Sequence, residues 1–296
     1  LLIGQSVSPV ELAKLAVVIY IGHWLASKRV EQLRRLPVGP LPFAIIVGII
    51  AGLVMAQPDV SEALVIVLVA AAMYFLAGAH PLQFVVGIAG GTAAFYLVAR
   101  QLPSVVNRFE PFLTSWRDPL SSRLSELHQL RQGLIALGSG GVLGLGPGSG
   151  RMSYNWVPYA HTDAIFAILG EELGLVGCLT VIGLFAVVAY RGFRIALHSP
   201  DTFGGLLAVG ITCWITFQAL INAAVVTGTI PYSGIALPFI SVGGSSLVTC
   251  MVGVGIMLSI SRVATEEGAL RSEIDRVRRR DGRARVSSPD GHRSPA

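Results

Sequence analysis

The first 261 residues alternate between long apolar runs and shorter polar or charged segments. The apolar runs cover residues 10–26, 41–56, 60–78, 82–99, 164–190, 204–228 and 244–261. A helix of about 20 apolar residues spans the hydrocarbon of a bilayer. The pattern therefore predicts an all-α polytopic membrane protein with about seven transmembrane helices. A tight turn at Gln57-Pro58 is expected to join the second and third spans, because proline breaks a helix.

Basic residues in the connecting segments predict the direction of each crossing. Four of them lie between Lys28 and Arg35 after the first run, Arg191 and Arg194 lie after the fifth, and an Arg-rich tail follows the seventh. Alternating crossings put these three segments on one side of the membrane. The positive-inside rule makes that side the cytoplasm.

Two parts of the chain lie outside the spans. Residues 100–163 form a long extracytoplasmic loop within the transmembrane domain, which we assign to residues 1–262. Residues 263–296 mix Arg with Ser, Pro, Gly and Asp, a composition typical of disorder. We expect a basic cytoplasmic tail that is disordered beyond a short helix. This tail is either solvated or rests on the anionic inner leaflet.

The composition excludes an ordinary soluble domain, because 53% of the residues are hydrophobic and only 13% are charged, with a mean hydropathy of +0.67. The net charge of +5 gives no support to nucleic-acid binding, since much of it comes from the tail. Cys178, Cys213 and Cys250 lie in apolar runs without CxxC spacing. We expect three buried thiols rather than disulfides or metal ligands.

The most informative polar residues come where the long loop re-enters the membrane, at His161-Thr-Asp163. A carboxylate at such a boundary is costly to keep and marks a functional site by default. His161 is two residues from Asp163 and so does not share its helical face. We therefore expect an orienting or structural role for His161 and a direct role for Asp163.

Further polar residues lie at or within span ends toward the same side, namely Glu11, Lys14, Asp59, Glu62, Glu171, Glu172 and Asn222. Glu11 and Lys14 are three residues apart and share one helix face. They are either a mutually neutralising pair or part of a site. Glu171 and Glu172 either bridge helices or act directly.

Seven of the thirteen residues from Gly138 to Gly150 are glycine. Glycine-rich loops can hold phosphates through backbone N–H groups. No Gly-Lys-Ser/Thr sequence ends this run and no βαβ pattern surrounds it, so a P-loop or a Rossmann fingerprint is excluded. The alternative is a tight re-entrant turn that is buried against other helices.

With these residues the chain resembles the SEDS family (shape, elongation, division and sporulation proteins) over nearly all of residues 5–262. The motifs that carry the resemblance are Ser8-Pro-Val-Glu11-Leu-Ala-Lys14, Gln57-Pro-Asp59, Gln129-Leu-Arg131-Gln132, His161-Thr-Asp163, Gly170-Glu-Glu-Leu-Gly174, Gln218-Ala-Leu-Ile-Asn222 and Leu237-Pro-Phe-Ile-Ser-Val-Gly-Gly-Ser245-Ser246. Family members have about ten spans. The resemblance therefore implies that this sequence is truncated at its N-terminus and lacks the first three.

The resemblance also implies an activity, which is polymerisation of lipid II into peptidoglycan strands outside the bacterial cytoplasmic membrane. The expected partners are lipid II (an undecaprenyl-diphosphate-linked disaccharide peptide), a class B penicillin-binding protein that crosslinks the strands, and the membrane lipid. The family's essential aspartate matches Asp163. We expect the substrate to be bound by Glu11, Lys14, Asp59, Gln129, Arg131, Gln132, His161, Ser245 and Ser246.

Three positions depart from the family pattern. Tyr159 replaces a common glutamate, Val242 replaces a common tyrosine, and Glu62 stands where a small threonine is usual. Glu62 can therefore supply a carboxylate that most family members lack. None of the three changes removes Asp163.

A glycosyl transfer of this kind needs a base for the attacking hydroxyl and positive charge at the leaving diphosphate. We expect Asp163 to be the general base of a single inverting displacement. Lys14, Arg131 or a Mg²⁺ or Mn²⁺ ion held by carboxylates would supply the positive charge. The alternatives are a lipid II flippase and a non-catalytic scaffold for a transpeptidase.

Overall fold

The computed structural model describes residues 8–57, 60–99, 112, 125–150, 163–231 and 233–286. Its helices are α1 (Pro9–Ala26), α2 (Val30–Leu33), α3 (Pro40–Met55), α4 (Val60–Leu76), α5 (Pro81–Ala99), α7 (Ser125–Gly140), α8 (Ile165–His198), α9 (Thr202–Val226) and α10 (Gly244–Val286). Seven of them coincide with the seven predicted apolar runs. The other two, α2 and α7, lie in connecting segments and were not predicted.

Seven of the described helices are apolar, and four of these are long enough to cross a membrane. Helices α1, α8, α9 and α10 are long and apolar enough to cross a membrane, and α3, α4 and α5 are shorter apolar helices. Leu41, Ile45, Ile49 and Leu53 recur every four residues along α3 and are all exposed. An exposed apolar stripe of this kind suits contact with lipid tails. The protein is therefore an all-α polytopic membrane protein, as predicted.

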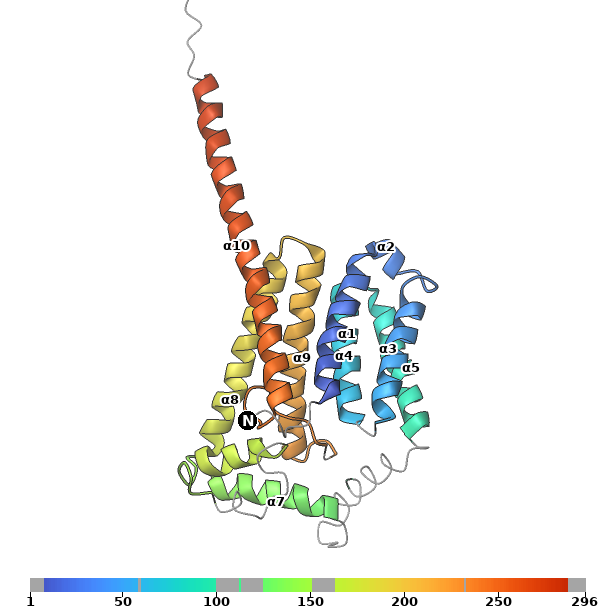
Figure 1. Cartoon of the computed structure of the whole chain (residues 1–296), viewed down its shortest axis with the longest axis vertical. Coiled ribbons are helices and arrows are strands. Elements are labelled where there is room, and N and C mark those ends of the chain that lie inside the picture. Colours follow the sequence, from blue (N-terminus) through green and yellow to red (C-terminus); the bar gives the residue numbers. More distant parts are fainter. Residues whose placement is uncertain are drawn as a thin grey trace, which may run out of the picture.

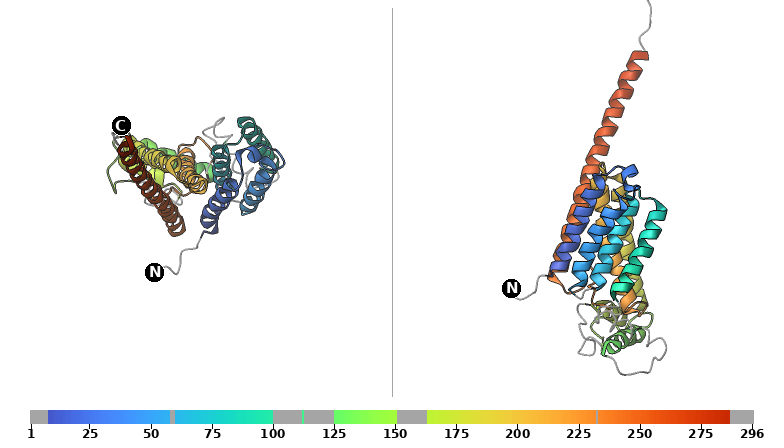
Figure 2. Two further views of the ribbon diagram at one scale, coloured as in Figure 1. Left: turned by 90° about the horizontal axis from the view of Figure 1, so that it is seen from above. Right: turned by 90° about the vertical axis from the view of Figure 1, so that its right-hand side faces the viewer.

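Helix α9 lies at the centre of the bundle. It packs against α8 on one side and against α1 and α4 on the other (Figures 1 and 2). In its apolar stretch 72% of the residues are buried, against 22% in α8 and in α10. Thr212, Gln218 and Asn222 on α9 are almost fully buried. Their polar atoms must find partners inside the protein, because an unpaired buried polar group is costly.

The connecting segments divide between the two ends of the bundle. Helix α2, the turn between α8 and α9, and the extension of α10 lie at one end, whereas α7 lies across the other (Figure 1). We call these the basic end and the loop end. The three basic segments thus share one end, as the alternation of spans requires.

Side chains of α3 and α4 fix the basic end. The Tyr74 hydroxyl donates a hydrogen bond to the Leu33 carbonyl at 2.9 Å, and the Tyr74 ring stacks on Phe43 with centroids 4.4 Å apart. A buried tyrosine typically both packs and bonds in this way. These contacts tie α2 to α4, and α4 to α3.

Helix α10 continues well beyond the bundle (Figure 1). It runs without interruption to Val286, further than the short helix expected after residue 262. In the exposed part, the Arg262 side chain bonds the Glu266 carboxylate one turn later at 2.8 Å. Pairs at this spacing add a few tenths of a kcal/mol to an exposed helix.

Candidate functional site

A buried ion triad lies between α1, α4 and α9. The Lys14 ammonium is 3.0 Å from a Glu11 carboxylate oxygen and 2.8 Å from one of Glu62. Lys14 is 2% exposed, Glu11 5% and Glu62 6%. The shared face of Glu11 and Lys14 was predicted from their spacing, and their ion pair agrees with the neutralising alternative. The Glu62 carboxylate, contributed by the first turn of α4, joins the same lysine.

The Lys14 ammonium has a third partner on α9. It donates to the Gln218 side-chain oxygen at 2.8 Å, and the Trp214 indole N–H donates to the same oxygen at 2.8 Å. The Trp214 ring centroid lies 5.6 Å from the ammonium, within cation–π range. The ammonium is thus almost fully buried, paired with two carboxylates and hydrogen-bonded to one amide oxygen. This arrangement encloses Lys14 within the protein.

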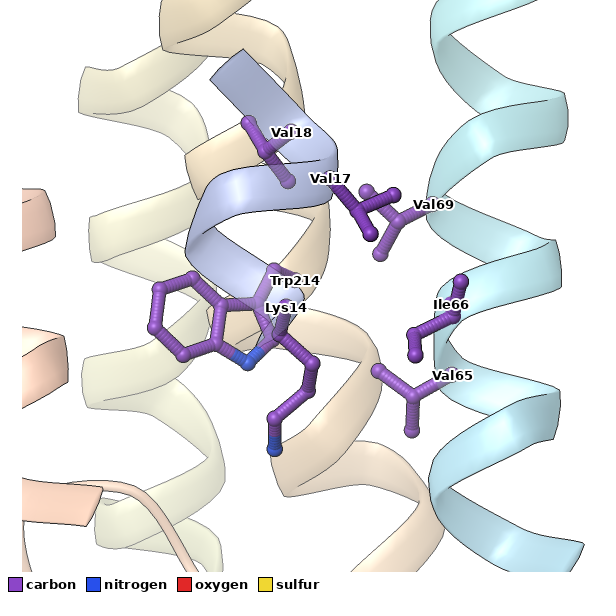
Figure 3. Close-up of a pocket in the computed structure, with 7 residues that line it drawn as sticks. All are labelled: Lys14, Val17, Val18, Val65, Ile66, Val69 and Trp214. Atoms are coloured by element: carbon purple, nitrogen blue, oxygen red, sulfur yellow. The ribbon is translucent and has the colours of Figure 1, made fainter. Parts of the chain in front are cut away.

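A small pocket adjoins the triad. Its lining consists of Lys14, Val17, Val18, Val65, Ile66, Val69 and Trp214 (Figure 3). The aliphatic residues come from α1 and α4, and only the lysine and the indole carry polar atoms. The Lys14 ammonium and the Trp214 indole N–H already have partners within the protein, so we do not assign this pocket to a polar substrate.

Asp163 is held at the loop end, two residues before α8 begins at Ile165. It is half-buried. The Asn222 side-chain nitrogen donates to the Asp163 carbonyl at 3.0 Å and to the Ile235 carbonyl at 2.7 Å. Residue 234 is a glycine, and a Cβ placed there would lie 2.8 Å from the Asp163 Oδ2 atom. The carboxylate therefore packs directly against the loop that leads to α10.

Two amides on α9 connect Asp163 with the triad. Gln218 and Asn222 are four residues apart and lie one above the other. The Gln218 side-chain oxygen accepts a hydrogen bond from the Lys14 ammonium, and the Gln218 side-chain nitrogen donates one to the Ala236 carbonyl at 2.9 Å. Asn222 bonds the adjacent Ile235. Sequence reasoning listed Asn222 among the polar residues at or within span ends, but quoted Gln218 only as part of a motif. The available signal was a pair of amides at helical spacing in an apolar span.

The glycine-rich segment pairs with an interruption in α8. The Leu145 and Gly146 N–H groups donate to the Glu171 and Glu172 carbonyls, and the Leu175 and Val176 N–H groups donate to the Gly141 and Val142 carbonyls. Gly174 leaves helical geometry at φ +67°, and a Cβ there would lie 2.4 Å from the Gly144 nitrogen. The Leu145 and Gly146 N–H groups of the glycine-rich segment thus donate to carbonyls of α8. The geometry agrees with the re-entrant turn rather than with a phosphate cradle.

The other predicted residues lie at the start of α10, on α7 or outside the described residues. The Ser245 hydroxyl accepts the Ser8 N–H at 3.2 Å, which joins the start of α10 to the start of α1. Ser246 is buried on α10. Gln129 lies in α7, where Gln132 is buried and Arg131 is exposed. Asp59 and His161 lie outside the described residues.

The carboxylates of the triad do not suit a divalent metal, because Lys14 lies between them. Across the described part of the chain, no three His, Cys, Asp or Glu side chains are grouped as a metal site. We therefore derive no chemical step through a metal ion.

The fold and these centres define a class: a polytopic helical membrane protein with a carboxylate where a long loop re-enters the bundle. Comparison with known proteins narrows the class. The family model FTSW_RODA_SPOVE, described as "Cell cycle protein", matches residues 2–266. The chain therefore belongs to the FtsW/RodA/SpoVE family, the SEDS proteins predicted from its motifs.

Two relatives illustrate the match. The chain is 40% identical over 259 residues to stage V sporulation protein E of Bacillus subtilis, covering 87% of this chain and 69% of that protein. It is 37% identical over 259 residues to the probable peptidoglycan glycosyltransferase FtsW of Geobacter metallireducens, covering 87% of this chain and 68% of the relative.

Solved structures share the fold. A chain of a peptidoglycan synthase complex, solved to describe the coordination of polymerization and crosslinking, superposes with a TM-score of 0.70 at 28% identity, covering 89% of this chain and 72% of that one. The rod shape determining protein RodA of Thermus thermophilus superposes with a TM-score of 0.57 at 26% identity, covering 86% of this chain and 65% of that one.

Proposed function

We propose that this protein is a peptidoglycan glycosyltransferase that polymerises lipid II, with Asp163 as the general base. The observation that carries the proposal is the position of Asp163. Its carboxylate is half-buried at the loop end and packed against Gly234, while its backbone is held by Asn222. Family membership and the relative named as a probable peptidoglycan glycosyltransferase support the same reaction.

The reaction transfers a sugar from a diphosphate carrier. The 4-hydroxyl oxygen of one sugar bonds to the anomeric carbon of another, whose bond to the diphosphate oxygen breaks. Inversion turns an α-linked donor into a β-linked product in one displacement. The Asp163 carboxylate accepts the hydroxyl proton, and the diphosphate leaves with the bonding electrons. The position just before α8 suits an anionic base, because a helix N-terminus favours negative charge.

The positive charge at the diphosphate is better supplied by Arg131 than by Lys14. Lys14 is enclosed by two carboxylates and an amide, and the triad carries no surplus positive charge. Arg131 is exposed on α7 at the loop end. A guanidinium binds phosphate oxygens through two parallel hydrogen bonds. Within this proposal Lys14 organises the helices and Arg131 contacts the substrate.

The loop end faces the outside of the bacterial cytoplasmic membrane in this proposal. The basic residues at the other end support this orientation. The similarity to a chain of a synthase complex that coordinates polymerization and crosslinking supports a transpeptidase partner, which we take to be a class B penicillin-binding protein.

The test is polymerisation of lipid II by purified full-length protein, with lipid II supplied only on the outer face of the vesicles. We expect polymer from the unchanged protein and none from Asp163→Asn. The matched control is Asp201→Asn, because Asp201 caps α9 at the basic end and asparagine also caps helices. Undiminished polymer from Asp163→Asn would remove Asp163 as the base. A flippase or scaffold would make no polymer in either form.

A further inference from the structure

The loop from Ser233 to Leu237 lies between the two centres and contacts both. Its Ala236 carbonyl accepts from Gln218, which also binds Lys14. Its Ile235 carbonyl accepts from Asn222, which also binds the Asp163 backbone. Gly234, the next residue along the loop, lies against the Asp163 carboxylate. We call these five residues, 233–237, the backing loop.

We infer that Gly234 and Asn222 are positioning residues for Asp163, and that the buried ion triad acts on catalysis through the backing loop. This inference rests on the proposed role of Asp163 as the base. It gives Gln218 and Lys14 a function that requires no contact with substrate.

The case for Gly234 is steric. A Cβ on residue 234 would lie 2.8 Å from Oδ2 and 3.5 Å from Cγ of Asp163. Real Cβ atoms essentially never approach another atom as closely as the first distance, so the carboxylate or the loop would have to move. A glycine allows the backbone to approach this closely. The absence of a side chain at residue 234 therefore sets where the carboxylate lies.

The case for Asn222 comes from its hydrogen bonds. Its side-chain nitrogen faces two carbonyls, one on each side, so it clamps residue 163 to the backing loop. Its side-chain oxygen is buried and has no hydrogen-bond partner among the described residues. An unpaired buried acceptor is costly. The unpaired oxygen makes this orientation of the Asn222 amide less favourable, and the two hydrogen bonds from its nitrogen offset that cost.

The link to the triad follows from Gln218. Its oxygen receives donors from Lys14 and Trp214, which orients its nitrogen toward the backing loop. Loss of Lys14 would remove one of the two donors that orient the amide and would loosen the loop at Ala236. The displacement would reach Asp163 through residues 234 and 235 of the same short segment.

The first test adds a methyl group at the contact. In Gly234→Ala we expect kcat for lipid II polymerisation to fall roughly 10- to 100-fold, because small displacements of a catalytic group cost that much. We expect KM for lipid II to stay within about threefold, because the change does not touch the substrate-binding residues. The control is Gly255→Ala on α10, where an added Cβ meets nothing within 4 Å.

The second test removes the clamp without adding bulk. In Asn222→Ala we expect a similar loss in kcat, and in both variants the acid limb of the kcat–pH profile should move. A defect that only reduced the amount of folded enzyme would lower kcat equally at every pH. If both variants keep kcat within twofold of the unchanged protein while Asp163→Asn is inactive, the inference is wrong and the proposed function stands. Polymer from Asp163→Asn would refute the proposed function instead.

Discussion

Removal of the cation from the buried triad is the perturbation whose outcome the geometry defines best. Lys14→Met keeps an unbranched apolar stem of similar length but deletes the ammonium. Glu11 and Glu62 would then face each other without a cation, each almost fully buried. Gln218 would lose one of the two donors on its oxygen.

The expected cost follows from the charges. With all three groups ionised, the triad carries two negative charges and one positive charge. Deleting one partner of a buried ion pair costs about 3–5 kcal/mol, because the other charge stays buried and unpaired. Two carboxylates are stranded in Lys14→Met, so we expect a loss of stability at the upper end of that range.

The opposite change should be mild. Glu62→Gln leaves Glu11 and Lys14 as a one-to-one pair and retains an oxygen that can accept from the ammonium. We expect a change in stability of about 1 kcal/mol or less. In the double variant Lys14→Met/Glu62→Gln only one carboxylate is stranded. Part of the loss seen in Lys14→Met should therefore be recovered, with a coupling energy of about 0.5–3 kcal/mol.

Thermal unfolding of the protein in lipid nanodiscs measures these differences. Lys14→Met should have the lowest midpoint, the double variant an intermediate one, and Glu62→Gln one near that of the unchanged protein. Lys28→Met is the control, because Lys28 is only partly buried and its ammonium lies 5.8 Å from the Trp24 ring. Equal midpoints for Lys14→Met and Glu62→Gln would refute the charge argument.

Three further predictions follow from other contacts. Gly174→Ala should lower stability by at least about 2 kcal/mol in the same assay, because φ is +67° and the added Cβ would lie too close to the Gly144 nitrogen. The control is Gly183→Ala, where a Cβ meets nothing within 4 Å and stability should change by less than about 1 kcal/mol. Arg131→Gln should raise KM for lipid II about tenfold, whereas Arg194→Gln at the basic end should leave it unchanged. Tyr74→Phe should cost about 1 kcal/mol on unfolding, since only the bond to the Leu33 carbonyl is lost.

The spans were predictable because lipid contact imposes length and apolar composition on every crossing helix. The pairing of Glu11 with Lys14 was also predictable, since a spacing of three residues fixes the shared face of a helix. Glu62 could not be added to that pair from sequence. Its contact with Lys14 depends on how α4 packs against α1, and helix periodicity does not report packing between helices.

The surroundings of Lys14 were hidden for a related reason. From the sequence, Glu11 and Lys14 could be a neutralising pair or part of a site. In the structure the Lys14 ammonium also contacts Glu62 and Gln218, which come from two other helices. The break in α8 at Gly174 was hidden as well. Glycine is common in membrane helices, and only the approach of the glycine-rich segment distinguishes this one.

The uninterrupted course of α10 determines where anything fused to its end would sit. The helix advances 1.5 Å per residue, so the stretch after Glu267 adds about 30 Å by Val286. A fluorescent protein fused after Val286 would therefore lie well beyond the lipid headgroups. Energy transfer from this label to a dye at the bilayer surface should be correspondingly weak. Each whole turn deleted from the extension of α10 should increase the transfer.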